Sequence, residues 1–163
     1  LGAEFQKIAQ DREGSIIEAL REIAADCGMA ICTGFPERDG SRVYNSAVLV
    51  RADGTAEFTR KTHLYGDAER AAFAVGQASP AVFDVNGVRT AMLICYDVEF
   101  PEAARYLADR GVEILFVSGL LVFSEQLFRG GKELFFLFLD VMLKQLLHHL
   151  DPTGEFKGAC LRM

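Results

Sequence analysis

The central part of the chain holds a strand-helix-strand pattern, which limits the possible folds more than any other feature. The apolar run Val88 to Ile94 follows Asn86-Gly87, the strongest short-range signal for a β-hairpin, and ends at Cys95. Pro101 suits the first turn of a helix, and Gly111 ends that helix before a second apolar run, "VEILFV". Such a unit normally crosses over right-handed and makes its two strands parallel. The pattern therefore predicts an α/β fold.

Cys95 lies at the carboxyl end of the first strand of this unit. Ligands of open α/β sheets collect beyond the carboxyl ends of the strands, so this position makes Cys95 a candidate site residue. The alternative is a small core residue, because cysteine is among the most buried residue types. Architecture alone leaves both interpretations open.

A nucleophilic cysteine needs a base or a cation nearby, because a thiol is mostly protonated at neutral pH. The candidates are in "RKTHLYGDAER". Lys61 and His63 are two residues apart at the end of an expected strand, so both could point the same way. A Cys/His hydrolase and a Cys/Lys hydrolase are both consistent with this pattern. Spacing does not choose between them.

The first part of the chain predicts a one-faced helix followed by strands. In "SIIEALREIAADCG", Ser15 and Glu18 have the spacing of a capping box, apolar residues recur on one face, and Gly28 ends the helix. Strands are expected at "MAICTGF" and "VYNSAVLV", and Asp53-Gly54 joins the latter to "TAEFTRK" in a hairpin. The sequence thus predicts a sheet with flanking helices.

Composition restricts the partners. The chain has 163 residues, half of them hydrophobic, which suffices for one core, and its formal net charge of -6 disfavours nucleic acid and anionic membranes. A small molecule is the expected partner. Four widely spaced cysteines without a CxxC pair, and no secretory leader at the amino end, indicate a reduced, cytoplasmic protein. There is no nucleotide-binding motif and His148-His149 lacks ligand partners, so no cofactor and no metal are predicted.

Two long runs of the sequence resemble the nitrilase superfamily of carbon-nitrogen hydrolases, most of all its amidase-like branches. They are "GFPERDGSRVYNSAVLVRADGTAEFTRKTHLYGDAERAAFAVGQ" and "FDVNGVRTAMLICYDVEFPEAARYLADRGVEILFV". The resemblance covers roughly residues 14–117 and implies an α-β-β-α sandwich. This chain would contribute one α/β half, incomplete, with a mixed sheet and flanking helices. The resemblance also implies a homo-oligomer in which two such halves pack back to back across a subunit interface.

The resemblance gives each site residue a role. Cys95 matches the nucleophile that attacks an amide, nitrile or carbamoyl carbon and forms a thioester, which water then hydrolyses. Lys61 matches the lysine that holds the oxyanion and supports proton transfer, and the backbone N–H of Tyr96 would be the second oxyanion donor. Glu69 matches a glutamate that lies beside the lysine. The expected substrate is a small non-peptide amide or carbamoyl compound.

One part of the family pattern has no match in this chain. The family's general base is a glutamate in an apolar strand well upstream of the helix that Ser15 begins, and Leu1 follows that point, so part of the domain is expected to be missing. Glu4, Glu37 and Glu102 do not fit its position. General base catalysis contributes about 100-fold to 10,000-fold, so this chain alone is expected to be inactive or nearly so. The alternative is a non-catalytic fragment or pseudoenzyme that keeps the fold and a self-associating surface.

Residues 122–163 depart from the family pattern. We therefore divide the chain into a partial carbon-nitrogen hydrolase domain, residues 1–121, and a divergent apolar tail, residues 122–163. Leu134 to Leu150 predicts a helix that is apolar nearly all round, but its length and internal charges favour a buried or interface helix over a membrane span. A truncated or frame-shifted reading of a longer gene would explain such a tail.

Overall fold

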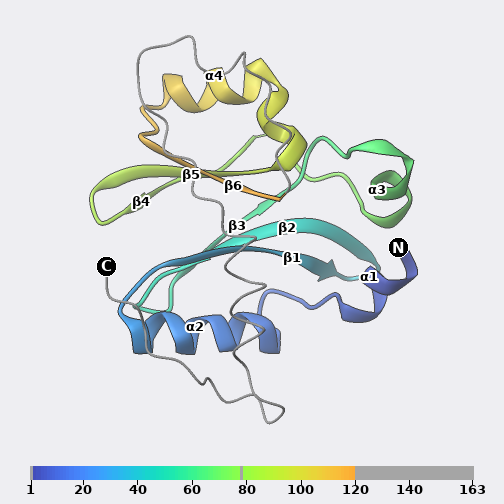
Figure 1. Cartoon of the computed structure of the whole chain (residues 1–163), viewed down its shortest axis with the longest axis horizontal. Helices are drawn as coiled ribbons and strands as arrows, with labels where there is room; N and C mark the ends of the chain where they lie inside the picture. Colours follow the sequence, from blue (N-terminus) through green and yellow to red (C-terminus); the bar gives the residue numbers. More distant parts are fainter. Residues whose placement is uncertain (1, 78, 120–163) are drawn as a thin grey trace.

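The computed structural model describes residues 2–77 and 79–119, which form a mixed α/β structure (Figure 1). The tail expected over residues 122–163 lies outside the described residues. In chain order the elements are α1 Gly2–Ile8, α2 Ser15–Cys27, β1 Ile31–Asp39, β2 Arg42–Val50, β3 Ala56–Arg60, α3 Gly66–Ala72, β4 Val82–Val85, β5 Val88–Ile94, the short 3-10 helix η1 Cys95–Glu99, α4 Pro101–Asp109 and β6 Ile114–Ser118.

The strands of the described residues form two three-stranded sheets. Sheet 1 has the order β1-β2-β3 with antiparallel neighbours. Sheet 2 has the order β4-β5-β6, in which β4 is antiparallel and β6 parallel to β5. Figure 1 shows the sheets face to face, with α2 on the outer side of sheet 1 and α4 on the outer side of sheet 2. The predicted α-β-β-α layering is therefore confirmed, and sheet 2 is a mixed sheet.

All four layers lie within one chain. This corrects the expectation that the chain supplies one α/β half and that a second subunit supplies the other. The reason is that β1 to β3 and β4 to β6 do not join into one sheet. Their apolar faces meet instead in a core between the sheets, which contains Cys32, Ala47, Leu49, Phe83, Met92 and Ile94. The homo-oligomer stays a prediction.

β5 is apolar on both faces because both of its faces are covered. Met92 and Ile94 lie in the core between the sheets, whereas Ala91 and Leu93 pack with Leu107 of α4 and with side chains of β6. This alternation follows the two-residue period of a strand. It places the end of β5, and with it the site region, at the meeting point of both cores.

The sequence signals on either side of β5 are confirmed. Asn86 and Gly87 have φ angles of 52° and 83°, the left-handed values that a type I′ turn requires, and they join β4 to β5. α4 begins at Pro101, and Gly111 has a φ of 71° just beyond its end. β6 pairs with β5 in parallel, as the strand-helix-strand pattern predicts.

α2 has the predicted bounds, but its amino end is not a capping box. Ser15 Oγ and the Ile16 N–H both donate to Gln10 Oε1, at 3.2 and 2.9 Å, and Glu18 pairs with an arginine three residues further on. Gln10 therefore accepts the hydrogen bonds of the first turn, although it lies outside the four consecutive residues of a capping box. Gly28, with a φ of 64°, ends the helix as predicted.

β1 is longer than the predicted strand, because it continues through Pro36 to Asp39. β1 is an edge strand, and the C=O of Pro36 accepts a hydrogen bond from the N–H of Gln10 on the side away from β2. The nitrogen of Pro36 faces the same side, where Gln10 forms a single bridge and none of the described strands pairs with β1, so no ladder donor is missing. The overlooked signal was Asp39-Gly40, which begins the turn into β2, where Gly40 has a φ of 57°.

Gly34 marks a close approach of the two sheets. A Cβ on Gly34 of β1 would lie 2.7 Å from Ser118 Oγ of β6, a distance that real Cβ atoms essentially never show. Glycine allows another chain segment to come this near because it has no side chain. A side chain at position 34 would therefore require Ser118 Oγ to move aside.

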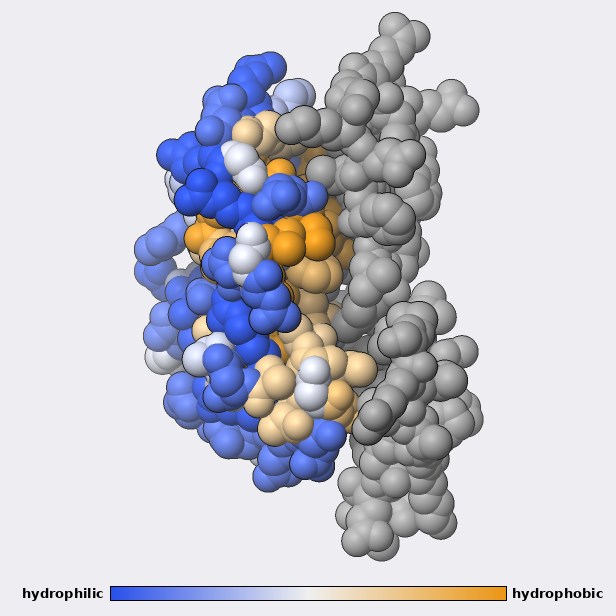
Figure 2. Space-filling view, turned by 90° about the vertical axis from the view of Figure 1, so that its left-hand side faces the viewer, coloured by the Kyte–Doolittle hydropathy of each residue, from blue (hydrophilic) through white to orange (hydrophobic). Residues whose placement is uncertain are grey.

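The described part of the face in Figure 2 is mostly hydrophilic, with apolar side chains gathered toward the middle of the view. The exposed large apolar side chains among the described residues are Ile8, Ile16, Met29, Tyr65 and Val75. Single exposed apolar residues are ordinary on a protein surface. Over residues 2–77 and 79–119, no helix is both long and apolar enough to span a membrane.

Candidate active site

Cys95 occupies the junction at which β5 ends and η1 begins. Its φ is 46°, and Asn86 is the one other non-glycine residue of the described ranges with a positive φ. This conformation costs a non-glycine residue about 1–2 kcal/mol, and such strain is concentrated at functional sites. The side chain is half-buried. The backbone therefore supports Cys95 as a site residue independently of any sequence motif.

Gly119 follows β6 and lies against Cys95. A Cβ on Gly119 would be 2.9 Å from the Cβ of Cys95, and Gly119 has a φ of 110°. Glycine is the residue that accepts both this backbone conformation and this close approach. The position of Cys95 thus depends on the absence of a side chain at residue 119.

We expect Gly119→Ala to slow the reaction of Cys95 with iodoacetamide by about 10-fold or more, because the new Cβ displaces the cysteine. Gly28→Ala is the matched control: Gly28 also has a positive φ, but a Cβ there meets nothing within 4 Å. Both substitutions cost about 1–2 kcal/mol of backbone strain. Peptide mass spectrometry gives the rate at Cys95, and equal rates in the two variants would contradict the expectation.

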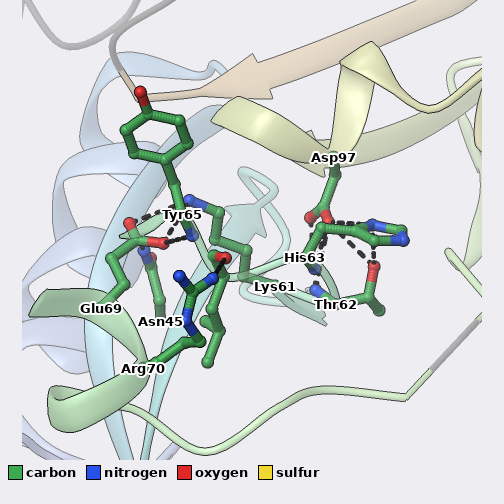
Figure 3. A network of polar contacts seen from close by, with 9 residues as sticks. Asn45, Lys61, Thr62, His63, Tyr65, Glu69, Arg70 and Asp97 are labelled. Atoms are coloured by element: carbon green, nitrogen blue, oxygen red, sulfur yellow. Dashed lines mark hydrogen bonds and ion pairs between the residues drawn. The ribbon is translucent and has the colours of Figure 1, made fainter. Parts of the chain in front are cut away.

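Lys61 directly follows β3 and is buried, with 1% of its surface exposed. Its Nζ lies 2.7 Å from Oε2 and 2.9 Å from Oε1 of Glu69, which α3 carries (Figure 3). A buried ammonium group without a partner is very unfavourable, so Glu69 makes this position of Lys61 possible. The structure therefore brings together two residues that the sequence singled out.

Glu69 is held by two further donors. Its Oε2 accepts a hydrogen bond from the N–H of Tyr65 at 2.7 Å, and its Oε1 lies 3.4 Å from Asn45 Nδ2. The C=O of Asn45 also accepts the N–H of Lys61 at 2.8 Å, so Asn45 contacts both members of the ion pair. Sequence reasoning missed Asn45, although it is a polar residue inside the apolar run "VYNSAVLV".

His63 does not share the surroundings of Lys61. The Nδ1 of His63 lies 2.9 Å from Asp97 Oδ1, and its ring stacks on Phe100 with the ring centroids 3.6 Å apart. Figure 3 shows the Lys61–Glu69 pair and the His63–Asp97 pair as two separate clusters. The expectation that Lys61 and His63 could point the same way is wrong, because β3 ends at Arg60 and strand alternation ends with it.

Asp97 lies in η1 and is 3% exposed. Its carboxylate accepts hydrogen bonds from the N–H groups of Thr62 and His63, at 3.2 and 2.8 Å, and from Thr62 Oγ1 at 2.9 Å. Because η1 begins at Cys95, these bonds join the segment after Lys61 to the turn that holds the cysteine. Sequence reasoning missed Asp97, whose signal was an acid two residues after Cys95.

Tyr96 follows Cys95 in the first turn of η1. Its ring makes edge-to-face contacts with Tyr65 and Phe100, each with ring centroids 5.1 Å apart. The first N–H groups of a helix have no acceptor within the helix. The role of the Tyr96 N–H as an oxyanion donor stays a prediction.

Glu37 of β1 belongs to a separate buried ion cluster that includes Arg60, the last residue of β3. It is 1% exposed and accepts hydrogen bonds from Arg12 Nε, Ser46 Oγ and Arg60 Nε at 2.7, 2.6 and 3.0 Å. Burial acts to raise the pKa of Glu37, but the hydrogen bonds from Arg60, Arg12 and Ser46 outweigh it and lower the pKa below the usual 4.5. Glu37 is therefore an ionised structural carboxylate.

Comparison with known proteins identifies the family of this chain. The sequence pattern of the family described as carbon-nitrogen hydrolase matches residues 1–132. The chain belongs to this family. Family membership confirms the resemblance to the nitrilase superfamily that the motifs of the sequence indicated.

Two curated carbon-nitrogen hydrolase relatives show how far the similarity extends. The (R)-stereoselective amidase of Pseudomonas sp. is 38% identical over 72% of this chain and 42% of its own length. The nitrilase of Pyrococcus abyssi is 38% identical over 63% of this chain and 39% of its own length. The chain thus spans about two fifths of the length of these relatives.

Among proteins of known structure, the chain is similar to the amidase from Nesterenkonia sp. AN1, a member of the nitrilase superfamily. One structure of it is similar to this chain with a TM-score of 0.60 and 36% identity, over 64% of this chain and 42% of the amidase. That structure is of a mutant in which acrylamide has added to the active-site cysteine.

Proposed function

We propose that Cys95 is the nucleophile of a carbon-nitrogen hydrolase that cleaves a small non-peptide amide or carbamoyl compound. The thiolate attacks the carbonyl carbon, a C–S bond forms, and the negative charge moves to the carbonyl oxygen. The C–N bond then breaks, the nitrogen takes up a proton and leaves as ammonia or an amine, and a thioester remains. Water hydrolyses the thioester to a carboxylic acid and restores the thiol.

The observation that carries this proposal is the hydrogen bonding between the segments that hold Cys95 and Lys61. Asp97, two residues after Cys95, accepts hydrogen bonds from Thr62, the residue after Lys61. The buried ammonium group of Lys61 then stabilises the oxyanion, and the Tyr96 N–H is the second donor. Each such donor is worth about 3 kcal/mol in a site that excludes water.

Cys95 is the described cysteine best placed for this role. Cys32 lies in the core between the sheets, and burial raises its pKa to about 12, which disfavours the reactive thiolate. Cys27 is the last residue of α2, in an outer layer. The acrylamide adduct of the Nesterenkonia amidase supports a cysteine nucleophile in a relative of this chain.

We further propose that this chain alone hydrolyses amides slowly or not at all. The candidate carboxylates around the site already have partners: Glu69 holds Lys61, and Asp97 holds Thr62 and His63. None of them is therefore assigned as the general base for the thiol or for water. The loss of a general base lowers the rate by about 100-fold to 10,000-fold.

Labelling with acrylamide tests the role of Cys95. We expect Cys95 of the wild-type chain to react about 10-fold faster than Cys27 or Cys160, as measured by peptide mass spectrometry over time. Cys95→Ser should remove the fast reaction and Cys27→Ser should retain it. Ammonia release from butyramide, a compound seen in complex with the Nesterenkonia amidase, is a second measurement. A Cys95 that reacts no faster than Cys160 would favour the non-catalytic alternative.

A further inference from the structure

The buried carboxylate of Asp97 has several hydrogen-bonding partners, more than one partner for the same oxygen. Its Oδ1 lies 2.8 Å from the N–H of His63, 2.9 Å from His63 Nδ1, 2.9 Å from Thr62 Oγ1 and 3.2 Å from the N–H of Thr62. The same His63 Nδ1 lies 3.0 Å from Thr62 Oγ1, so the carboxylate, the hydroxyl and the ring form one compact polar cluster. All of these donors belong to two consecutive residues of one loop.

Aromatic contacts join the same two segments independently. We call residues 61–65 the Lys61 loop and residues 95–100 the Cys95 turn. The ring of His63 stacks on Phe100 with an interplanar angle of 13°, and Tyr65 meets Tyr96 edge to face. Stacked and edge-to-face ring pairs are favourable arrangements of aromatic side chains. Two kinds of contact therefore hold the Lys61 loop against the Cys95 turn.

Side chains, rather than backbone pairing between the sheets, align the Lys61 loop with the Cys95 turn. The Lys61 loop extends from β3 in sheet 1, whereas the Cys95 turn extends from β5 in sheet 2. Within the described ranges no ladder of backbone hydrogen bonds joins β3 to sheet 2. Apolar contacts between sheets resist separation but are not directional. The hydrogen bonds of Asp97 are directional, so they can fix the relative position of the two segments where apolar packing cannot.

We propose that Asp97 is a positioning residue that fixes the Lys61 loop relative to the Cys95 turn and so sets the placement of the ammonium group beside the thiol. This inference rests on the proposed function, because it requires Cys95 and Lys61 to act on one substrate. Asp97 does not touch the substrate. It acts through Thr62 and His63.

Two substitutions of Asp97 test the inference. Asp97→Ala removes every acceptor, and we expect the reaction of Cys95 with acrylamide to slow by about 10-fold to 100-fold because the two groups lose alignment. Asp97→Asn keeps one side-chain oxygen, so the rate should stay within about 3-fold of wild type. Asp84→Ala is the matched control, because Asp84 Oδ1 also accepts a backbone N–H, that of Gly87 at 2.7 Å, in the β4–β5 hairpin. The control should leave the rate unchanged.

Amide hydrogen exchange gives a readout that does not depend on chemistry at Cys95. In Asp97→Ala the N–H groups of Thr62 and His63 should exchange about 10-fold faster or more, as measured by NMR, while Asp97→Asn and Asp84→Ala keep the wild-type rates. Thr62→Val, which removes one donor and keeps the carboxylate, should slow labelling by about 3-fold. This variant decides the question if Asp97→Ala does not fold.

The two possible failures are distinguishable. Failure of the proposed function shows in the wild-type protein, as a Cys95 that acrylamide labels no faster than Cys160, and it overturns both proposals. Failure of the present inference alone shows as a selectively labelled Cys95 whose rate is the same in Asp97→Ala, or, if that variant is unfolded, in Thr62→Val. Slower labelling in Asp97→Ala that Asp97→Asn does not restore also overturns it.

Discussion

Replacing Lys61 with methionine is expected to slow the addition of acrylamide to Cys95 by about 100-fold to 1,000-fold. Addition places negative charge on the amide oxygen, and the loss of one oxyanion donor costs a factor of about this size. Methionine keeps much of the volume of lysine, so the buried position stays filled. Peptide mass spectrometry over time gives the rate at Cys95 in both proteins.

Two further variants make this test specific. Lys7→Met is the control, because Lys7 is 70% exposed and pairs with Glu4 at the surface, so the rate should not change. Lys61→Met leaves the partly buried Glu69 without its cation, at a cost of about 1–3 kcal/mol. Adding Glu69→Gln should recover that stability without recovering the rate. A rate that returns with stability would assign Lys61 a structural role only.

The largest effect on stability is expected at Glu37. Glu37→Gln leaves Arg12 and Arg60, which are 43% and 20% exposed, beside a neutral amide. Removing one partner of a buried ion pair costs about 3–5 kcal/mol, and the partial exposure of the arginines reduces this to about 2–4 kcal/mol. Urea unfolding measures the change in the free energy of unfolding. Glu4→Gln, at a 71% exposed side chain, should change it by less than about 0.5 kcal/mol.

Glu37 also sets a dependence of stability on pH. Its pKa is lowered from the ordinary 4.5 in the folded protein, so near that pH the folded protein binds fewer protons than the unfolded chain. The contribution of Glu37 is therefore complete above the unfolded pKa and is lost as the pH falls through the folded pKa. The stability difference between wild type and Glu37→Gln should be constant near neutral pH and shrink in acid below pH 4.5. A difference that grows in acid would show that the pKa is raised instead.

The elements around Cys95 could be predicted because neighbours in the sequence determine each of them. Asn86-Gly87 sets the hairpin through its backbone conformation, Pro101 begins α4, and the connection through α4 makes β5 and β6 parallel. The family motifs named Lys61 and Glu69, which the structure shows as an ion pair. The sequence did not reveal that Cys95 has a left-handed backbone.

What the sequence did not predict depends on contacts between distant segments. Local spacing suggested that Ser15 caps α2, but Gln10 does so because the chain folds back there. The sequence pattern predicts where strands lie but not which sheet each strand joins. The strands of this chain were therefore expected to form only one half of the sandwich. Asp97 acts on residues 35 and 34 positions earlier, a relation that no short motif contains.

The two sheets each carry one half of the proposed chemistry, since Lys61 follows β3 and Cys95 follows β5. The distance between the thiol and the ammonium group therefore depends on the separation of the two sheets. Gly34, opposite Ser118, allows the sheets to pack closely. A closely packed interior passes on a displacement rather than absorbing it, so a bulky residue at 34 would reach the reacting atoms from a distance.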